Sequence, residues 1–172
     1  MSNAAAARAT TLPEKPAPLW KRRWAQNTAL FAIAAAGVYG IIYHDVVSRA
    51  REAFEQGELY MSWYRDPAAK RAHFDKQFED GRAALDAQLS QKKITDVEYH
   101  RKLDALEFDR DFAMSESSLK YAYQWYKDTY ELFSPPESEW VRQARQKAPE
   151  ALDLWKQELR AQKIPFDDTM FE

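Results

Sequence analysis

Histidine is the side chain that most often binds metals or moves protons, and this 172-residue chain has three histidines. His44, His73 and His100 lie far apart, and none has a second histidine four residues away, the spacing that places two imidazoles on one helix face. We expect His44 at a membrane–water boundary and the other two on exposed helix positions. The histidines therefore predict neither a metal site nor a catalytic site.

An acidic cluster is the second group that could do chemistry: Asp104, Glu107, Asp109 and Asp111. Carboxylates bind divalent cations, but a calcium loop also needs a glycine and regularly spaced oxygen ligands, which this segment lacks. Arg110 interrupts the cluster. We therefore interpret these residues as a solvated helix face.

Several other reactions lack the residues that they need. The chain has no cysteine, which excludes disulfides, thiolate metal sites and cysteine nucleophiles. It contains no glycine-rich phosphate loop, nucleophile elbow or zinc-protease motif. The sequence predicts a protein that is not an enzyme and that carries no cofactor or metal.

The segment from Trp24 to Tyr43 (WAQNTALFAIAAAGVYGIIY) is uncharged, in a chain that is otherwise rich in charge. A helix of about 20 residues spans the hydrocarbon core of a bilayer, which is about 30 Å thick. Aromatic and basic residues flank this segment and suit the headgroup layer. We predict a transmembrane helix over residues 24–44, with a core or interfacial helix as the alternative. The predicted membrane-interface residues are Trp20, Lys21, Arg22, Arg23, Trp24 and Tyr43.

Charge predicts the orientation of this helix. Residues 1–24 carry a net charge of +4, so the remainder carries −6 within the total of −2. By the positive-inside tendency, the tail over residues 1–23 lies on the cytoplasmic or matrix side and the rest lies outside. We expect a retained signal-anchor rather than a cleaved signal. The basic flank predicts contacts with lipid headgroups, and the acidic remainder predicts no nucleic-acid partner.

A small number of glycines and prolines, four and eight, indicates an all-α chain. Apolar residues keep helical spacing beyond the membrane, which predicts a stalk over residues 45–65 that continues the spanning helix. They are Val47, Ala50, Phe54, Gly57, Met61 and Tyr64.

Capping residues predict a helical hairpin over residues 66–133. Asp66 as N-cap and Pro67 in the first turn start one helix, which ends near Lys93. Thr95 and Glu98 form a capping box that starts a second helix, from about residue 96 to residue 133.

The remaining residues, 134–172, contain two breaks. After the prolines at 135 and 136, Pro149 is expected to divide this segment into two short helices. The residues from Phe166 onward are expected to be ordered only if a neighbour holds them. The predicted fold is thus all-α: one N-terminal transmembrane helix continuing into an extended helical arm, with a helical hairpin and short C-terminal helices.

Residues 85–106 (LDAQLSQKKITDVEYHRKLDAL) resemble the SHOCT-type helical hairpin, in which a tight turn precedes an Ile-Thr-acidic motif that opens the next helix. Lys92 and Lys93 replace the usual glycine, and Val97 replaces an acid. The resemblance implies an interaction or oligomerisation module rather than a catalytic one.

The segment 121–133 (YAYQWYKDTYELF) has aromatic rings on two sides of its predicted helix. Tyr121 and Trp125 point away from the stripe of Tyr123, Tyr126 and Tyr130. Two aromatic faces predict a partner interface, because docking surfaces are rich in such rings, and an internal core is the alternative. The predicted interface residues are Tyr121, Trp125, Tyr126, Tyr130, Trp140 and Trp155.

Small residues recur every four positions within the predicted span, at Thr28, Ala32, Ala36 and Gly40. Such a strip lets another helix approach closely. The alternative is that an alanine-rich helix meets this pattern by chance.

In layout the chain resembles the single-span accessory subunits of mitochondrial respiratory complexes, especially those of the membrane arm of complex I. The resemblance implies a non-catalytic structural subunit of the inner membrane, with its N-terminus in the matrix and its arm in the intermembrane space. Its partners would be other subunits of a large membrane complex. Complex I is favoured over ATP synthase. The twin Cys-x9-Cys pattern of some such subunits is absent.

Two other functions are compatible with the same anchor. One is a bacterial or organellar single-span tether or assembly factor, which would bind its partner transiently. The other is a membrane-bound enzyme, which would need Asp, Glu or His side chains converging on a pocket.

Overall fold

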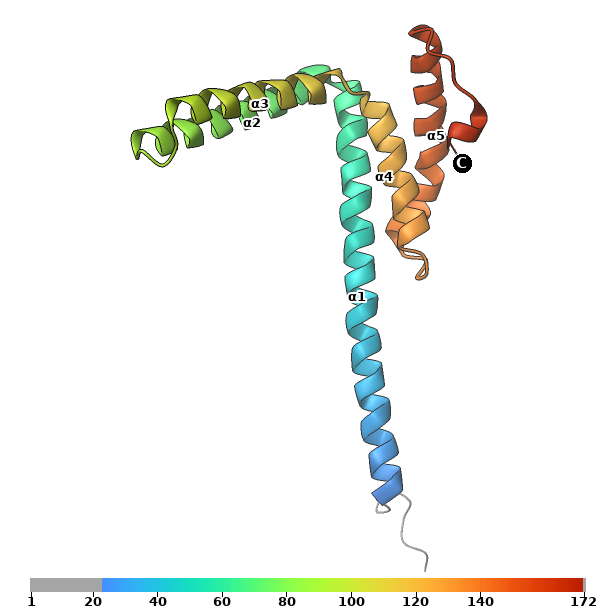
Figure 1. The fold of residues 1–172 in the computed structure, drawn as a ribbon. Coiled ribbons are helices and arrows are strands. Elements are labelled where there is room, and N and C mark those ends of the chain that lie inside the picture. Colours follow the sequence, from blue (N-terminus) through green and yellow to red (C-terminus); the bar gives the residue numbers. More distant parts are fainter. Residues whose placement is uncertain (1–22, 172) are drawn as a thin grey trace, which may run out of the picture. The chain divides into compact units, whose positions relative to one another are not determined.

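The computed structural model describes residues 23–171, and within this range the chain is all-helical, without a strand. This confirms the all-α prediction. Figure 1 shows the elements in order along the chain: α1 (Arg23–Arg65), α2 (Pro67–Ser90), α3 (Asp96–Ser115), α4 (Ser118–Leu132), α5 (Glu139–Ala161) and the 3-10 helix η2 (Asp168–Phe171).

Helix α1 runs for 43 residues without a break, as the apolar spacing predicts. Among the described residues it is the one helix that is long and apolar enough to cross a membrane, and none of its apolar window is buried by the rest of the chain. The hydroxyl of Thr28 donates to the carbonyl oxygen of Trp24 at 2.9 Å, so this polar group is satisfied inside the helix. The chain divides between Ile42 and Tyr43 into two compact units.

Both predicted helix caps are present. The Asp66 carboxylate accepts hydrogen bonds from the backbone N–H groups of Ala68 and Ala69, at 3.1 and 3.2 Å. In the capping box, the N–H of Glu98 donates to Thr95 Oγ1 at 3.3 Å, while the N–H of Thr95 donates to the Glu98 carboxylate at 2.9 Å. Lys92 has φ 57°, a left-handed conformation that glycine adopts without strain.

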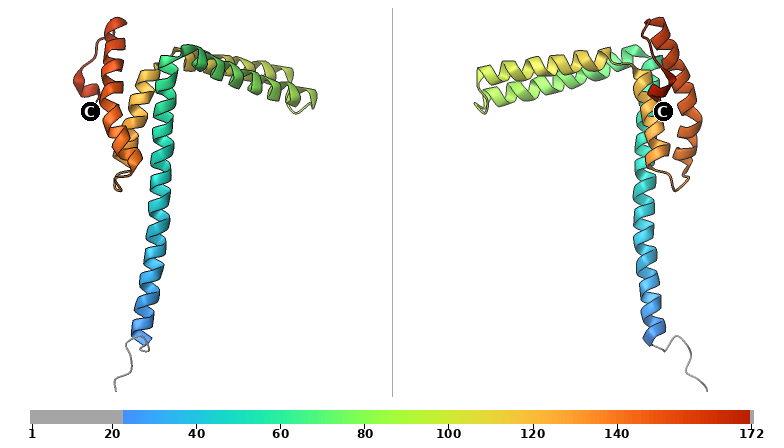
Figure 2. Two further views of the ribbon diagram at one scale, coloured as in Figure 1. Left: turned by 180° about the vertical axis from the view of Figure 1, so that it is seen from behind. Right: turned by 45° about the vertical axis from the view of Figure 1, so that its right-hand side comes forward.

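Helices α2 and α3 lie side by side in the views of Figures 1 and 2. Their packing is tight at Gly81, where a methyl group built on the glycine would lie 3.1 Å from Leu106. The Tyr99 hydroxyl donates to Asp86 at 2.7 Å across the same seam. Buried Lys70 joins the other end, because its ammonium group donates to the carbonyl oxygens of Met114 and Glu116.

The prediction of one helix from residue 96 to residue 133 is wrong. Helix α3 ends at Ser115, and Glu116 and Ser117 adopt extended backbone conformations before α4 begins. Ser117 caps α4 by accepting from the N–H of Lys120 at 3.2 Å. The helix break leaves the carbonyl oxygen of Glu116 without a donor from the helix backbone. The Lys70 ammonium group donates a hydrogen bond to this oxygen and so satisfies it.

The core lies between α4, α5 and the part of α1 that follows Tyr43. Tyr121 of α4 lies on Tyr60 of α1, whereas the later Tyr126 lies on the earlier Phe54, so the two helices run antiparallel. The central buried residues are Phe54, Met61, Leu119, Ala122, Tyr123, Tyr126, Ala144, Ala148 and Ala151.

The prediction that Pro149 separates two helices is also wrong, because α5 continues through it from Glu139 to Ala161. Proline inside a helix costs about 3 kcal/mol by removing a backbone donor and by steric clash. Pro149 is exposed, while Ala144, Ala148 and Ala151 on the inner face are almost completely buried. Packing of that face keeps the two halves in one helix.

The last residues are held by the chain itself, which corrects the expectation that they need a neighbour. Phe171 is buried, and its ring meets Trp155 edge-on with centroids 5.0 Å apart. Its carbonyl oxygen accepts from the Tyr123 hydroxyl at 2.7 Å and from the Lys127 ammonium at 3.2 Å. Residues 164–171, called the strap below, therefore fold back onto α4 and α5.

Candidate partner interface

Tyr126 faces the core and not a partner, which corrects its assignment to a partner interface. Its side chain is 1% exposed and packs against Phe54 with ring centroids 5.7 Å apart. Gly57 makes room for it: a methyl group there would lie 2.6 Å from Cε1 of Tyr126. The glycine and the tyrosine are therefore complementary halves of one helix contact.

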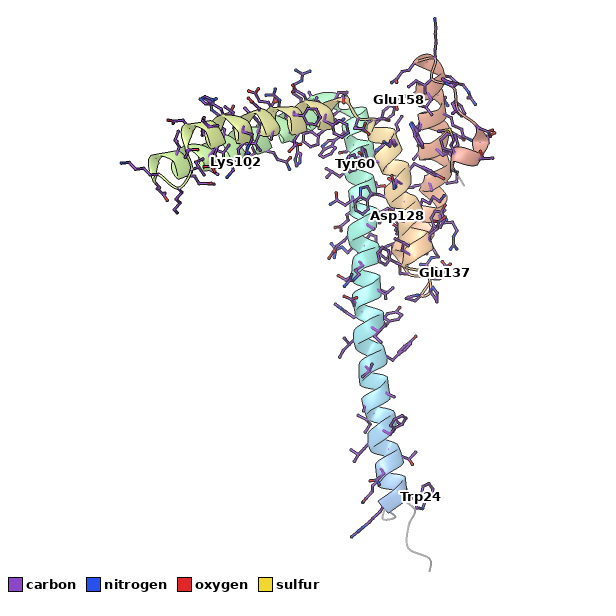
Figure 3. All side chains as sticks on the ribbon, viewed as in Figure 1. Trp24, Tyr60, Lys102, Asp128, Glu137 and Glu158 are labelled. Carbon is purple, nitrogen blue, oxygen red and sulfur yellow. The ribbon has the colours of Figure 1, made fainter. Side chains whose placement is uncertain are left out.

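Tyr121, from the second aromatic face of α4, is used within the chain as well. Its ring stacks on Tyr60, which is labelled in Figure 3, with centroids 5.1 Å apart and planes 25° apart. Tyr60 in turn meets Trp63 edge-on at 4.9 Å. Tyr121 therefore lies half-buried against α1, whereas Tyr126, on the other face of α4, is almost completely buried in the core.

Trp140 and Tyr130 close the core at the start of α5. The ring of Trp140 lies 5.6 Å from that of Phe54, and the guanidinium of Arg51 lies 5.6 Å from the Trp140 ring. Tyr130 is partly buried, with the Arg145 guanidinium 5.7 Å from its ring. Both side chains therefore belong mainly to internal packing.

Trp155 connects α5 to the strap. Its ring lies 6.0 Å from that of Tyr123 and meets Phe171 edge-on. Trp125 differs from the other predicted interface residues, because its ring meets neither another aromatic ring nor a cation within residues 23–171, whereas Tyr130 contacts the Arg145 guanidinium. Trp125 is half-buried, so part of its indole surface is available for a partner.

A charged cluster that the sequence analysis missed ties three helices together. The Glu58 carboxylate of α1 accepts hydrogen bonds from the Tyr126 hydroxyl of α4 and from the Lys147 ammonium of α5, the latter at 2.5 Å. Burial alone would raise the pKa of Glu58, but the bonds from Lys147 and Tyr126 outweigh it and lower that pKa. Burial and the Glu58 charge both raise the pKa of Tyr126. The only sequence signal for this site was Gly57, the residue before Glu58, which stands in an otherwise apolar helical pattern and leaves room for the Tyr126 ring.

A hollow of about 590 Å³ lies where α1, α2, the end of α3, α4 and α5 meet. Its charged groups already have partners in the chain: Lys70 donates to carbonyl groups, Lys120 pairs with Glu116 at 2.8 Å, and Glu158 accepts from Ser117. Burial lowers the pKa of Lys70. The hollow is therefore a structural junction.

No group of three or more His, Asp or Glu side chains within residues 23–171 is arranged to hold a metal ion. The three histidines are exposed, as expected for His73 and His100, and His73 contacts the Trp63 ring with centroids 4.9 Å apart. The acidic residues of α3 are exposed along the helix.

The predicted membrane residues are distributed over the first half of α1 and the segment before it. Arg23, Trp24 and Tyr43 are exposed, and so is the small-residue strip of Thr28, Ala32, Ala36 and Gly40. No side chain of the described chain approaches within 4 Å of a methyl group built on Gly40. Trp20, Lys21 and Arg22 lie outside the described residues.

Comparisons with protein-family models, with curated proteins and with solved structures find no match for this chain. Its function is therefore inferred from its own residues.

Proposed function

We propose that this chain is a non-catalytic accessory subunit of a multi-subunit respiratory membrane complex, anchored by a single span and stabilising the membrane part of that complex. Complex I of the mitochondrial inner membrane is the favoured complex. The chain would place its N-terminus in the matrix and its helical arm in the intermembrane space.

One observation carries this proposal: no residue of the apolar window of α1 is buried by the described chain. Large exposed apolar surfaces on proteins are covered by lipid or by other proteins. The strip of Thr28, Ala32, Ala36 and Gly40 supplies a narrow face on which a second helix can pack. Lipid around the span and one partner helix on the strip would together cover this window.

Purification of the native chain tests the proposal. Membranes are solubilised in a mild detergent and separated by native electrophoresis, and the chain is quantified by mass spectrometry. We expect a fixed ratio to the other subunits of one large complex. Migration of the chain alone, near its own 20.1 kDa, would overturn the proposal. Recovery well below one copy per complex would favour a tether or assembly factor instead.

Matched substitutions in the span test how the chain is held. Ala32→Leu and Ala36→Leu fill the small-residue strip, so each is expected to lower retention of the chain in the complex. Ala34→Leu makes the same change about 180° around the helix from the centre of the strip and is expected to leave retention unchanged. Equal retention of all three variants would argue against packing on the strip.

A further inference from the structure

The outer face of α3 carries an exposed aromatic pair that takes no part in the core. The rings of Phe108 and Phe112 stack with centroids 6.1 Å apart and planes 13° apart. They are 68% and 52% exposed. Two neighbouring phenylalanines so accessible to water are typical of a docking surface rather than of a solvated helix.

This face points away from α2. Leu106 is the α3 residue that contacts Gly81 of α2. At about 100° per residue, Phe108 and Phe112 lie about 200° and 240° around the helix from Leu106. Ala105 and Arg101 continue the same face toward the start of α3, giving a spacing of four, three and four residues. That spacing is the one by which a helix packs along another helix.

The borders of the aromatic pair are acidic. Asp104, Glu107, Asp109 and Asp111 lie on the same two turns, and all four are exposed. The one basic residue between them, Arg110, is turned toward α2, and its guanidinium lies 4.8 Å from the Phe78 ring of that helix. The same guanidinium pairs with the neighbouring Asp111 of α3 at 2.8 Å. Asp104 and Asp109 form no ion pair with any side chain in residues 23–171. Residues 104–111 thus carry four carboxylates against one guanidinium, so the charge beside the aromatic pair is negative, while Arg101 lies on the same face nearer the start of α3.

We propose that this α3 face binds an amphipathic helix of a partner subunit, in which lysine or arginine residues flank the apolar stripe. The apolar stripe would cover Phe108 and Phe112, and the cations would pair with the bordering carboxylates. A second copy of this chain in register would place carboxylates against carboxylates, which is unfavourable. The inference rests on the proposed subunit function and gives the chemistry of one partner.

Site-specific photocross-linking in native membranes tests this docking. The full-length chain carries Phe108→p-benzoylphenylalanine, and a control chain carries Ala83→p-benzoylphenylalanine on the exposed outer side of α2. After irradiation, the linked peptides are sequenced by mass spectrometry. We expect position 108, and not position 83, to link to a different protein, with at least two lysines or arginines within a turn of the linked residue.

Other products contradict the proposal. Links to a second copy of this chain would indicate self-association, links to acyl chains would indicate a lipid surface, and an absence of protein links would indicate a free face. A link to a segment without basic residues would also overturn it.

Charge removal provides the second readout. Asp104→Asn with Glu107→Gln keeps the shape of the face and removes two charges, so the yield of the cross-link at position 108 is expected to fall roughly threefold to tenfold. Asp80→Asn on α2 is the control and is expected to leave the yield unchanged. An unchanged yield in the Asp104/Glu107 variant would contradict a basic partner.

The two proposals can fail separately. If the chain remains in a large complex but position 108 links to no basic segment, only the docking inference fails. If the chain migrates alone, the subunit proposal fails whatever position 108 contacts.

Discussion

The Tyr126 hydroxyl of α4 donates a hydrogen bond to the Glu58 carboxylate of α1, across 68 residues of sequence. The same carboxylate oxygen accepts from Lys147 of α5. This oxygen is therefore the point at which the three helices of the core are joined by polar contacts, beside an otherwise aromatic and alanine-rich interior.

Removal of this hydroxyl should measurably destabilise the arm. Tyr126→Phe keeps the buried ring and deletes one hydrogen bond to a charged acceptor, so we expect the free energy of unfolding to fall by about 1–2 kcal/mol. Denaturant unfolding of the chain in detergent, followed by tryptophan fluorescence, measures the change. Tyr130→Phe is the control, because no hydrogen bond of the Tyr130 hydroxyl is found within residues 23–171. Equal effects of the two variants would contradict the role of the Glu58 bond.

The dependence of stability on pH should include a contribution from Glu58. Its pKa is lowered from the ordinary value of 4.5, so the folded state favours the charged carboxylate. This stabilisation is complete well above pH 4.5 and is lost progressively as the pH falls past 4.5 and through the lower folded pKa. The side chain is 38% exposed, so solvent screening limits the contribution to roughly 0.5–1 kcal/mol.

Comparison with Glu58→Gln isolates that contribution. Glu116 also has a lowered pKa, whereas burial raises the pKa of Asp128, so the wild-type profile alone combines several groups. We expect the stability difference between wild type and Glu58→Gln to shrink between about pH 6 and pH 3. A difference that stays constant over this range would show that the Glu58 charge contributes nothing.

Gly57 should tolerate no side chain. Alanine normally stabilises a helix by about 1 kcal/mol relative to glycine, but here its methyl group would lie 2.6 Å from the rigid, buried Tyr126 ring. We expect Gly57→Ala to lower the free energy of unfolding by about 1–3 kcal/mol. Gly81→Ala is the matched control, because its nearest neighbour is the flexible end of Leu106 at 3.1 Å. Thermal unfolding followed by circular dichroism compares them, and a stabilising Gly57→Ala would contradict the contact.

The strap should depend on its last aromatic ring. Phe171→Ala removes the contact with Trp155 and is expected to cost about 2 kcal/mol, less than for a central core phenylalanine because the short helix η2 can shift. Hydrogen exchange of the amides in residues 164–171 should rise in this variant. Met170→Ala is the control, since Met170 is 68% exposed. Unchanged exchange in Phe171→Ala would show that the strap is held by its backbone bonds alone.

Local chemistry was sufficient for several elements. The Asp66 cap, the Thr95–Glu98 capping box and the unbroken α1 follow from residues within a few positions of each other, and the structure has all three. The all-α class follows from the same local signals. A capping bond needs only its own turn, so one sequence contains all the information for it.

The candidate interface was predicted less well. An aromatic stripe on a helix indicates burial but does not identify what covers it, so Tyr126 was assigned to a partner when Gly57 of α1 receives it. The Glu58 cluster was missed because its members come from three distant segments.

The sequence by itself determined the apolar segment that is long enough to span a membrane, the helix starts at Asp66 and Thr95, and the absence of cysteine chemistry. Only the tertiary structure decided that α3 and α4 separate at Ser117, that α5 continues through Pro149, and that Phe171 folds back onto Trp155. Each of these depends on packing free energy from residues tens of positions away. The free energy of that packing exceeds the local tendency of a proline to break a helix and of a terminal segment to remain unfolded. A residue pattern confined to one segment carries no information about these distant contacts.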